Sequence, residues 1–151
     1  MRDPLSKAQR SRLMARVKAR GNKSTELELT AALKRYHVVG WRRHPKNVLG
    51  RPDFYFRTEK LAVFVDGCFW HACPKCGRLP KSRVEFWTSK ITGNRLRDKR
   101  VGARLRGQGI AVLRFWEHEV GVSAKKCINK IVEKLWSQRR DAVAAIRLSE
   151  K

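Results

Sequence analysis

Apolar positions recur along the chain with two different periods. Some stretches repeat them at helical spacing, and others carry the short apolar runs that are typical of strands. The pattern predicts helices from Ser24 or Thr25 to before Gly40, over 84–106 with an interruption near Gly93, and over 124–136, with strands over 41–44, 54–56, 61–65 and 110–116. Because helices separate several of the strands, we expect an α/β fold with a mixed central sheet flanked by helices.

The two ends of the chain are more polar than its middle. In the basic stretch 1–20 the spacing of Leu13, Met14 and Val17 allows a short amphipathic helix, and the stretch fits either an arm that docks on phosphates or a solvated, partly disordered tail. Beyond Gln138 the pattern weakens to a frayed helix or tail. We therefore expect an N-terminal arm over 1–20, a folded domain over 21–138 and a C-terminal tail over 139–151.

The charge of the chain indicates a polyanionic partner. Its 151 residues, one domain by the usual size, contain 36 lysines and arginines against 13 acids, a net charge of +23. Long-range attraction to nucleic acid follows. An anionic membrane surface is the rival partner, but no apolar run approaches the roughly 18–20 residues of a spanning helix. A ribosomal protein is also this basic, although five tryptophans argue against a bare RNA-coating protein.

Cysteine spacing is the most specific chemical signal. The basic N-terminus lacks the apolar segment of a signal peptide, so we expect a cytosolic protein whose cysteines bind metal or stay as free thiols. Cys68, Cys73 and Cys76 have the C-x4-C-x2-C spacing of metal ligands. A structural zinc needs four ligands, and His118, which follows the last predicted strand, completes the set.

Two nearby residues have competing interpretations. Cys127 recurs at helical spacing with apolar residues, which is typical of a buried apolar side chain rather than of a ligand. His71 has ligand spacing from Cys68, so zinc ligation is one role open to it. We expect an acid–base role instead, because His118 already completes the zinc set.

Several carboxylates fall at positions that suit a hard cation. Glu26 and Glu28 stand in the first turn of the first predicted helix, where acids also suit the helix dipole. Asp53 begins one predicted strand and Asp66 ends the next. Because Mg²⁺ prefers oxygen ligands, water and substrate phosphate, this combination predicts a magnesium site.

Five motifs stand in order along the chain: GRPDF at 50–54, VDGCFWH at 65–71, EFW at 85–87, NRLRD at 94–98 and VLRFWEHE at 112–119. The helix with Glu26, a strand that opens in Pro-Asp and a second strand are similar to the core of the PD-(D/E)xK nucleases. More specifically, the five motifs resemble those of the very short patch repair DNA mismatch endonucleases. The resemblance runs from about residue 6 to residue 136, nearly the whole chain.

The resemblance implies an enzyme that nicks one strand of DNA beside a T:G mismatch, the lesion left when 5-methylcytosine deaminates. It implies a restriction-endonuclease-like core, Mg²⁺ as catalytic cofactor and a structural Zn²⁺ site. By position it assigns these roles: Asp53 as the central metal-binding carboxylate, Glu26 (with Glu28 as the alternative) as an acid that reaches the metal through water, Val65 as donor of a backbone carbonyl to the metal, His71 as the catalytic histidine and Asp98 as an acid of the active-site surround.

One position departs from the wider nuclease pattern. Where that pattern has Glu-x-Lys on the second strand, this chain has Val65, Asp66 and Gly67, so no lysine stands there. Water activation would then fall to the metal ions, with His71 as acid or base near neutral pH.

Aromatic and basic residues supply the expected DNA contacts. The aromatics beside the cysteines are either core residues or, as the resemblance favours, wedges that enter a base step next to the mismatch. Basic residues over 84–106 suit phosphate contacts, with two polar side chains there expected at the bases. The expected DNA-binding set is Met14, Phe69, Trp70, Trp87, Lys90 and Asn94.

The leading interpretation is thus a bacterial, cytoplasmic, nucleoid-associated endonuclease with its catalytic domain over 21–138. We expect a monomer that acts on double-stranded DNA with a mismatch, with repair proteins as potential partners. Two alternatives stay open: a zinc-stabilised nucleic-acid-binding protein without cleavage, and a restriction-type endonuclease that cuts both strands. Acids placed to repel phosphate favour an enzyme over a binding module.

Overall fold

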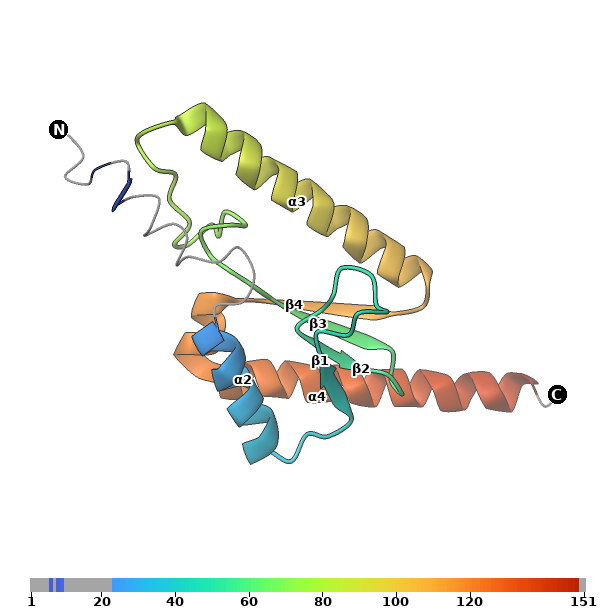
Figure 1. The fold of residues 1–151 in the computed structure, drawn as a ribbon. Helices are drawn as coiled ribbons and strands as arrows, with labels where there is room; N and C mark the ends of the chain where they lie inside the picture. Colours follow the sequence, from blue (N-terminus) through green and yellow to red (C-terminus); the bar gives the residue numbers. More distant parts are fainter. Residues whose placement is uncertain (1–5, 7, 10–22, 150–151) are drawn as a thin grey trace.

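The computed structural model describes residue 6, residues 8–9 and residues 23–149, so Met14 and most of the basic arm lie outside the described part (Figure 1). The main described segment contains three helices and four strands. In chain order they are α2 (Lys23–Arg35), β1 (Trp41–Arg43), β2 (Phe54–Phe56), β3 (Leu61–Asp66), α3 (Val84–Gly107), β4 (Ala111–Trp116) and α4 (Glu117–Ser149). Among the described helices, none combines the length and apolarity that crossing a bilayer requires.

The strands form one mixed sheet in the order β1-β2-β3-β4. β2 is antiparallel to both of its neighbours, and β4 is parallel to β3, with Leu61 opposite Ala111 and Asp66 opposite Trp116. Parallel pairing requires a crossover connection, which contains α3. The carboxyl ends of β3 and β4 therefore lie at the same edge of the sheet.

Side-chain alternation in β3 divides the core between the two faces of the sheet. Leu61 and Val63 belong to a cluster with residues of α2 and α4, whereas Ala62 and Phe64 pack with Leu105 of α3. Figure 1 shows the same layers, with α3 on one side of the sheet and α2 and α4 on the other. The predicted α/β fold, a mixed central sheet flanked by helices, is confirmed.

The predicted interruption of the second helix near Gly93 is wrong, because α3 runs continuously from Val84 to Gly107. A glycine inside a helix costs about 1 kcal/mol relative to alanine but keeps its backbone N–H, so it does not break the helix. Gly93 is exposed, and nothing lies within 4 Å of the place where a Cβ atom would be. No neighbouring element therefore distorts the helix there.

The last helix is longer than the predicted 124–136, although its part after the kink at Ser123 begins at Ala124 as predicted. Ahead of the kink, the Trp116 N–H donates to Glu119 Oε2 at 2.8 Å, a capping contact for a further helical segment that begins at Glu117. Ser123, with φ −160° and ψ 89°, kinks it. Beyond the predicted end, Arg139 pairs with buried Glu59 at 2.7 Å. The stretch 139–149 is therefore helical, one of the two forms that the sequence allowed.

Candidate active site and metal centres

Glu26, His44 and Asp53 form the first candidate site, here called the acid site. Their potential ligand atoms all lie within 4.8 Å of one another. Antiparallel pairing of β1 and β2 places His44 beside Asp53, since the His44 N–H donates to the Asp53 carbonyl at 3.4 Å. Glu26, only 4% exposed, reaches the same point from α2. Glu28 is exposed and joins no such cluster in the described part of the chain.

Hydrogen bonds fix both carboxylates of the acid site. Asp53 Oδ2 accepts a hydrogen bond from the Val65 N–H at 2.6 Å, which ties the acid site to β3. Glu26 Oε2 accepts from Arg43 Nη2 at 2.7 Å and lies 2.9 Å from His44 Nε2. Burial, with the nearby Glu26 charge, raises the pKa of Asp53 to about 6, although the Val65 hydrogen bond opposes the rise.

Two carboxylates this close repel each other when both are ionised, and a divalent cation relieves that repulsion. Oxygen donors are the ligands that Mg²⁺ prefers. The Asp53 and Glu26 carboxylates therefore fit a divalent metal ion. Because both side chains are largely buried, their charges are less well solvated than those of surface acids, and a bound cation would compensate for this.

A second cluster joins Asp66, His71 and Asp98, whose ligand atoms also lie within 4.8 Å of one another. His71 Nδ1 lies 2.5 Å from Asp98 Oδ2. Burial raises the pKa of Asp98, but the His71 hydrogen bond and the Arg114 charge outweigh it, so the pKa is lowered overall. Because Asp98 engages Nδ1, the other ring nitrogen of His71 is the one available for proton transfer.

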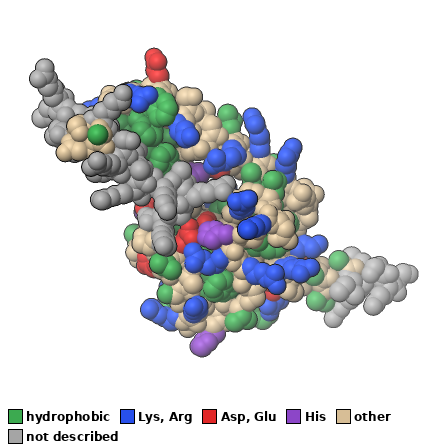
Figure 2. Space-filling model, viewed as in Figure 1, with side chains coloured by type: hydrophobic (Ala, Val, Ile, Leu, Met, Phe, Trp, Pro, Cys, Tyr) green, Lys and Arg blue, Asp and Glu red, His purple; other side chains and the backbone are tan. Residues whose placement is uncertain are grey.

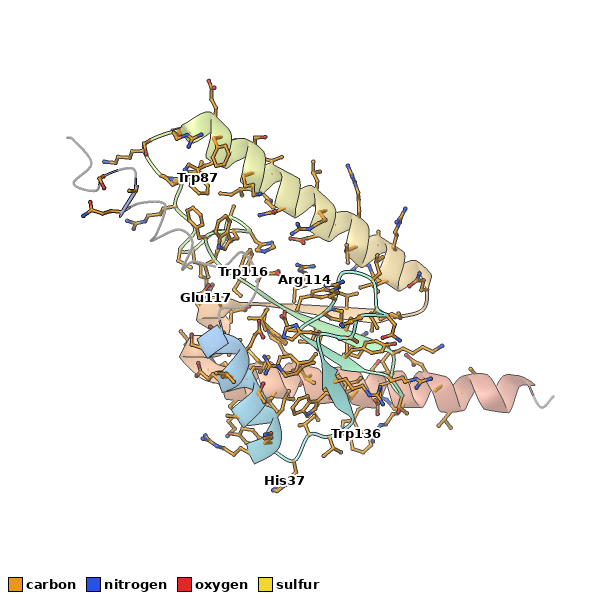
Figure 3. All side chains as sticks on the ribbon, viewed as in Figure 1. His37, Trp87, Arg114, Trp116, Glu117 and Trp136 are labelled. Atoms are coloured by element: carbon orange, nitrogen blue, oxygen red, sulfur yellow. The ribbon has the colours of Figure 1, made fainter. Side chains whose placement is uncertain are left out.

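Arg114 connects the acids of this second cluster. Its Nε and Nη2 atoms donate to the two oxygens of Asp66 at 2.7 and 2.6 Å, and Nη2 lies 3.5 Å from Asp98 Oδ1. Figure 3 shows Arg114 between the sheet and α3. Sequence reasoning missed the roles of Arg114 and His44, and the only signal for Arg114 was its place inside the VLRFWEHE motif.

The predicted zinc residues come together from two parts of the chain. Sulfur atoms of Cys68, Cys73 and Cys76 lie 3.3, 3.5 and 3.5 Å from the Nδ1 atom of His118. Ligands of a tetrahedral zinc are about 3.5 Å apart, given Zn–S and Zn–N bonds of about 2.3 and 2.0 Å. Three sulfurs around one imidazole nitrogen therefore fit a zinc ion, and His71 is turned toward Asp98 instead.

The cysteine loop is tightly folded around this zinc-type cluster. Backbone N–H groups of Cys73 and Gly77 donate to the carbonyls of Cys68 and Cys73 at 2.9 and 2.8 Å. A Cβ atom at Gly77 would meet the Cys73 backbone at 2.5 and 2.7 Å, so only glycine fits there. Burial and the neighbouring thiols raise the pKa of Cys68 to about 12, and a bound metal is what would hold it as a thiolate.

Cys127 lies apart from this cluster. It is 3% exposed and packs in the apolar core with residues of α4 and α2. Burial raises the pKa of its thiol to about 11. Both observations agree with the expectation of a buried apolar residue.

Phe69 and Trp70 of the cysteine loop and Trp87 of α3 contact one another. Their ring centroids are 5.1 to 6.0 Å apart, and Phe86, 48% exposed, extends the group. Asn94 is 9% exposed and donates to the Trp70 carbonyl at 3.0 Å, so it ties the loop to α3. Lys90 is exposed on α3. The rings are only half-buried and belong to neither core cluster.

Known proteins resemble this chain over most of its length. A sequence model of the family described as DNA mismatch endonuclease Vsr matches residues 2–77. The type II nicking enzyme V.XorIIP of Xanthomonas oryzae is 38% identical over 124 residues, 80% of this chain and 88% of the relative. V.NmeDIP, a type II nicking enzyme of Neisseria meningitidis serogroup C, is 39% identical over 85% of this chain and 87% of its own.

The DNA mismatch endonuclease Vsr of Escherichia coli is 36% identical over 119 residues, 78% of this chain and 74% of the relative. The α/β fold, the clusters of acids and histidines and these relatives define the chain as a DNA endonuclease, a hydrolase whose substrate is DNA. It belongs to the DNA mismatch endonuclease Vsr family.

Proposed function

We propose that this endonuclease nicks one DNA strand next to a T:G mismatch by metal-dependent hydrolysis. The observation that carries the proposal is the meeting of both acid-containing clusters at the end of β3. Val65 donates to Asp53 there, and the next residue, Asp66, pairs with Arg114 and through it with Asp98. A cation site and a proton-transfer histidine are thus held by one short strand.

The chain's own residues divide the work of hydrolysis. Asp53 and Glu26 would hold Mg²⁺ with the Val65 carbonyl, and Mg²⁺ would supply Lewis acidity and a lowered pKa for bound water. His71 moves a proton at Nε2, while Asp98 fixes its tautomer. Figure 2 shows acids and histidine, in red and purple, surrounded by basic side chains in blue on one face. Such a face attracts the DNA backbone, and the acids within it select a cation.

Mismatch recognition is assigned to the aromatic rings on the zinc-braced loop. A mismatched base step costs less to unstack than a paired one, so rigid apolar rings would enter it selectively. The cysteine loop holds Phe69 and Trp70 opposite Trp87, and Asn94 restrains the backbone between them. The name of the Escherichia coli relative, a DNA mismatch endonuclease, supports this assignment.

The test is cleavage of a duplex with a single T:G mismatch, labelled on each strand in turn, in Mg²⁺ or in EDTA. We expect Mg²⁺-dependent nicking of the T strand alone, and no nicking of the matched duplex. Tight binding of several mismatches without cleavage would replace the proposal with a binding module. Equal cutting of both strands of matched DNA would indicate a restriction-type enzyme.

Replacing Trp87 with phenylalanine is expected to remove a large part of the fluorescence quenching that mismatched duplex causes, because stacking on a base quenches indole emission. Trp136→Phe is the control, since Trp136 is 60% exposed on α4 and lies far from Trp87 in Figure 3. Titration with T:G and matched duplexes gives the comparison. Equal quenching in the wild-type protein and in Trp87→Phe would mean that the rings only pack against each other.

Arg114→Lys is expected to slow single-turnover nicking about tenfold with little change in DNA affinity, because a lysine ammonium cannot make the two-point contact of Nε and Nη2 with Asp66 that also places Nη2 beside Asp98. Arg100→Lys, on the exposed side of α3, is the matched control. Rates at saturating protein measure the step, and duplex binding measures affinity. A loss of affinity at an unchanged rate would show that Arg114 contacts DNA rather than positions the His71–Asp98 pair.

A further inference from the structure

His44 is the member of the acid site that no sequence motif indicated. Its ring lies between the two carboxylates, with Nε2 at 2.9 Å from Glu26 Oε2 and Nδ1 at 3.9 Å from Asp53 Oδ1. The first distance is a hydrogen bond and the second is too long for one. Only one nitrogen of an imidazole can bind a given ion, and one ligand atom from each of the three residues lies within 4.8 Å of the others, close to the spacing of about 3 to 4 Å between ligands that are about 2.1 Å from one ion.

Glu26 does not need His44 as its counter-charge. Arg43 Nη2 already pairs with Glu26 Oε2 at 2.7 Å, and the guanidinium is always charged. The His44 side chain is 46% exposed, whereas the Glu26 and Asp53 side chains are 5% and 15% exposed. The imidazole is therefore the most exposed of the three side chains of the acid site.

The backbone at His44 holds this position at an energetic cost. Its φ of 45° is in the left-handed region, which residues other than glycine seldom adopt. Straight after β1, this conformation turns the side chain back toward Asp53. His37 has the same conformation, with φ 52°, in an exposed turn after α2. Figure 3 shows His37 at the far end of α2, pointing away from the protein.

Imidazole and carboxylate ligands differ in the cations that they favour. Mg²⁺ takes oxygen ligands and water, and it gains little from an imidazole nitrogen. First-row transition metal ions bind sites with nitrogen and oxygen ligands, with an affinity that is lowest for Mn²⁺ and rises along the row, and imidazole suits such ions better than it suits Mg²⁺. A site with one imidazole and two carboxylates should therefore discriminate between Mn²⁺ and Mg²⁺, although both suit the carboxylates.

We propose that His44 is a direct ligand of the cation in the acid site and that it makes this site bind transition metal ions such as Mn²⁺ in preference to Mg²⁺. This inference rests on the proposed metal-dependent function, because it assigns a further ligand to the same cation. Glu26 and Asp53 supply the oxygen donors common to both cations, and His44 supplies the selectivity.

The experiment measures Mn²⁺ and Mg²⁺ binding by calorimetry, with Mn²⁺ electron paramagnetic resonance as a second readout, on zinc-loaded full-length protein without DNA. Four proteins are compared at one neutral pH: wild type, His44→Gln, His37→Gln and Asp53→Asn. We expect His44→Gln to lower Mn²⁺ affinity about tenfold or more and to leave Mg²⁺ affinity within about twofold. His37→Gln, the same residue type on the same backbone conformation, should match wild type.

Each other result has a definite meaning. If His44→Gln weakens both cations equally, or tightens both, His44 is a positioning group or a counter-ion and the inference is wrong. If wild type binds both cations, and Asp53→Asn binds both as well as wild type does, the acid site is not the cation site and the proposed function fails with it. Loss of both cations in Asp53→Asn, with an unchanged ratio in His44→Gln, rejects the inference alone.

Discussion

Asp53→Asn is expected to reduce nicking of a T:G duplex by about 10³-fold or more, because loss of a metal-binding carboxylate removes on the order of 4 kcal/mol of transition-state stabilisation. Asparagine keeps an oxygen that can accept the hydrogen bond from the Val65 N–H, which the Asp53 carboxylate accepts at 2.6 Å. The fold should therefore survive while the charge that attracts the cation is lost. Single-turnover rates at saturating protein, with Mg²⁺ in excess, measure the effect.

The stability of Asp53→Asn is expected to change in the opposite direction from its activity. The folded-state pKa of Asp53, about 6, lies above the ordinary aspartate value of 3.8, so the native state binds more protons. Ionisation of Asp53 thus destabilises the fold as the pH rises from about 4 to 6, by about 1.4 kcal/mol for each pKa unit. Without metal at pH 7.5, the variant should melt at an equal or higher temperature. A lower melting temperature would mean that Asp53 is structural.

Cys73→Ser is expected to release zinc and to lower the free energy of unfolding by several kcal/mol. Structural zinc contributes about 10–16 kcal/mol of apparent binding free energy in small folds, against about 5–15 kcal/mol for the total stability of a typical domain. Cys73 is 1% exposed, and its sulfur lies 3.5 Å from His118 Nδ1. Nicking should fall with it, because the loop that carries Phe69, Trp70 and His71 loses its brace.

Cys127→Ser is the matched control, because Cys127 is also buried, at 3% exposure, but lies in the apolar core. It should keep one zinc per chain and lose only about 1–3 kcal/mol for a hydroxyl buried in that core. Metal analysis of purified protein and thermal melts with and without a zinc chelator make the comparison. Zinc loss from Cys127→Ser, with zinc retained in His118→Ala, would move the fourth ligand to Cys127.

Local signals in the sequence were sufficient for the elements and for part of the chemistry. The apolar runs of β2, β3 and β4 are strong enough to place these strands within a residue at each end. Cysteine spacing singled out three residues that do lie around His118. These features are local, since they depend on residues close in sequence or on one dominant apolar period.

The ends of the helices were harder to predict from the sequence. The extension of α4 depends on the contact of Arg139 with Glu59, residues far apart in the chain, and its additional segment before the kink at Ser123 depends on a hydrogen bond to Glu119. The continuity of α3 past Gly93 reflects the small cost of glycine against the many backbone hydrogen bonds of a long helix. Periodicity alone does not weigh such contributions.

The sequence by itself determined the α/β class, the basic charge and the residue types of the candidate site, because each follows from composition, period or spacing. Only the tertiary structure decided that Glu26 rather than Glu28 meets Asp53 and that His71 turns to Asp98 instead of the sulfurs. The same holds for His44, which lies in the acid site, and for Arg114, which contacts Asp66 and Asp98. The physical reason is that the pairing of β1 with β2 and of β3 with β4 brings together side chains up to about 50 residues apart, and no local pattern records which of them will meet.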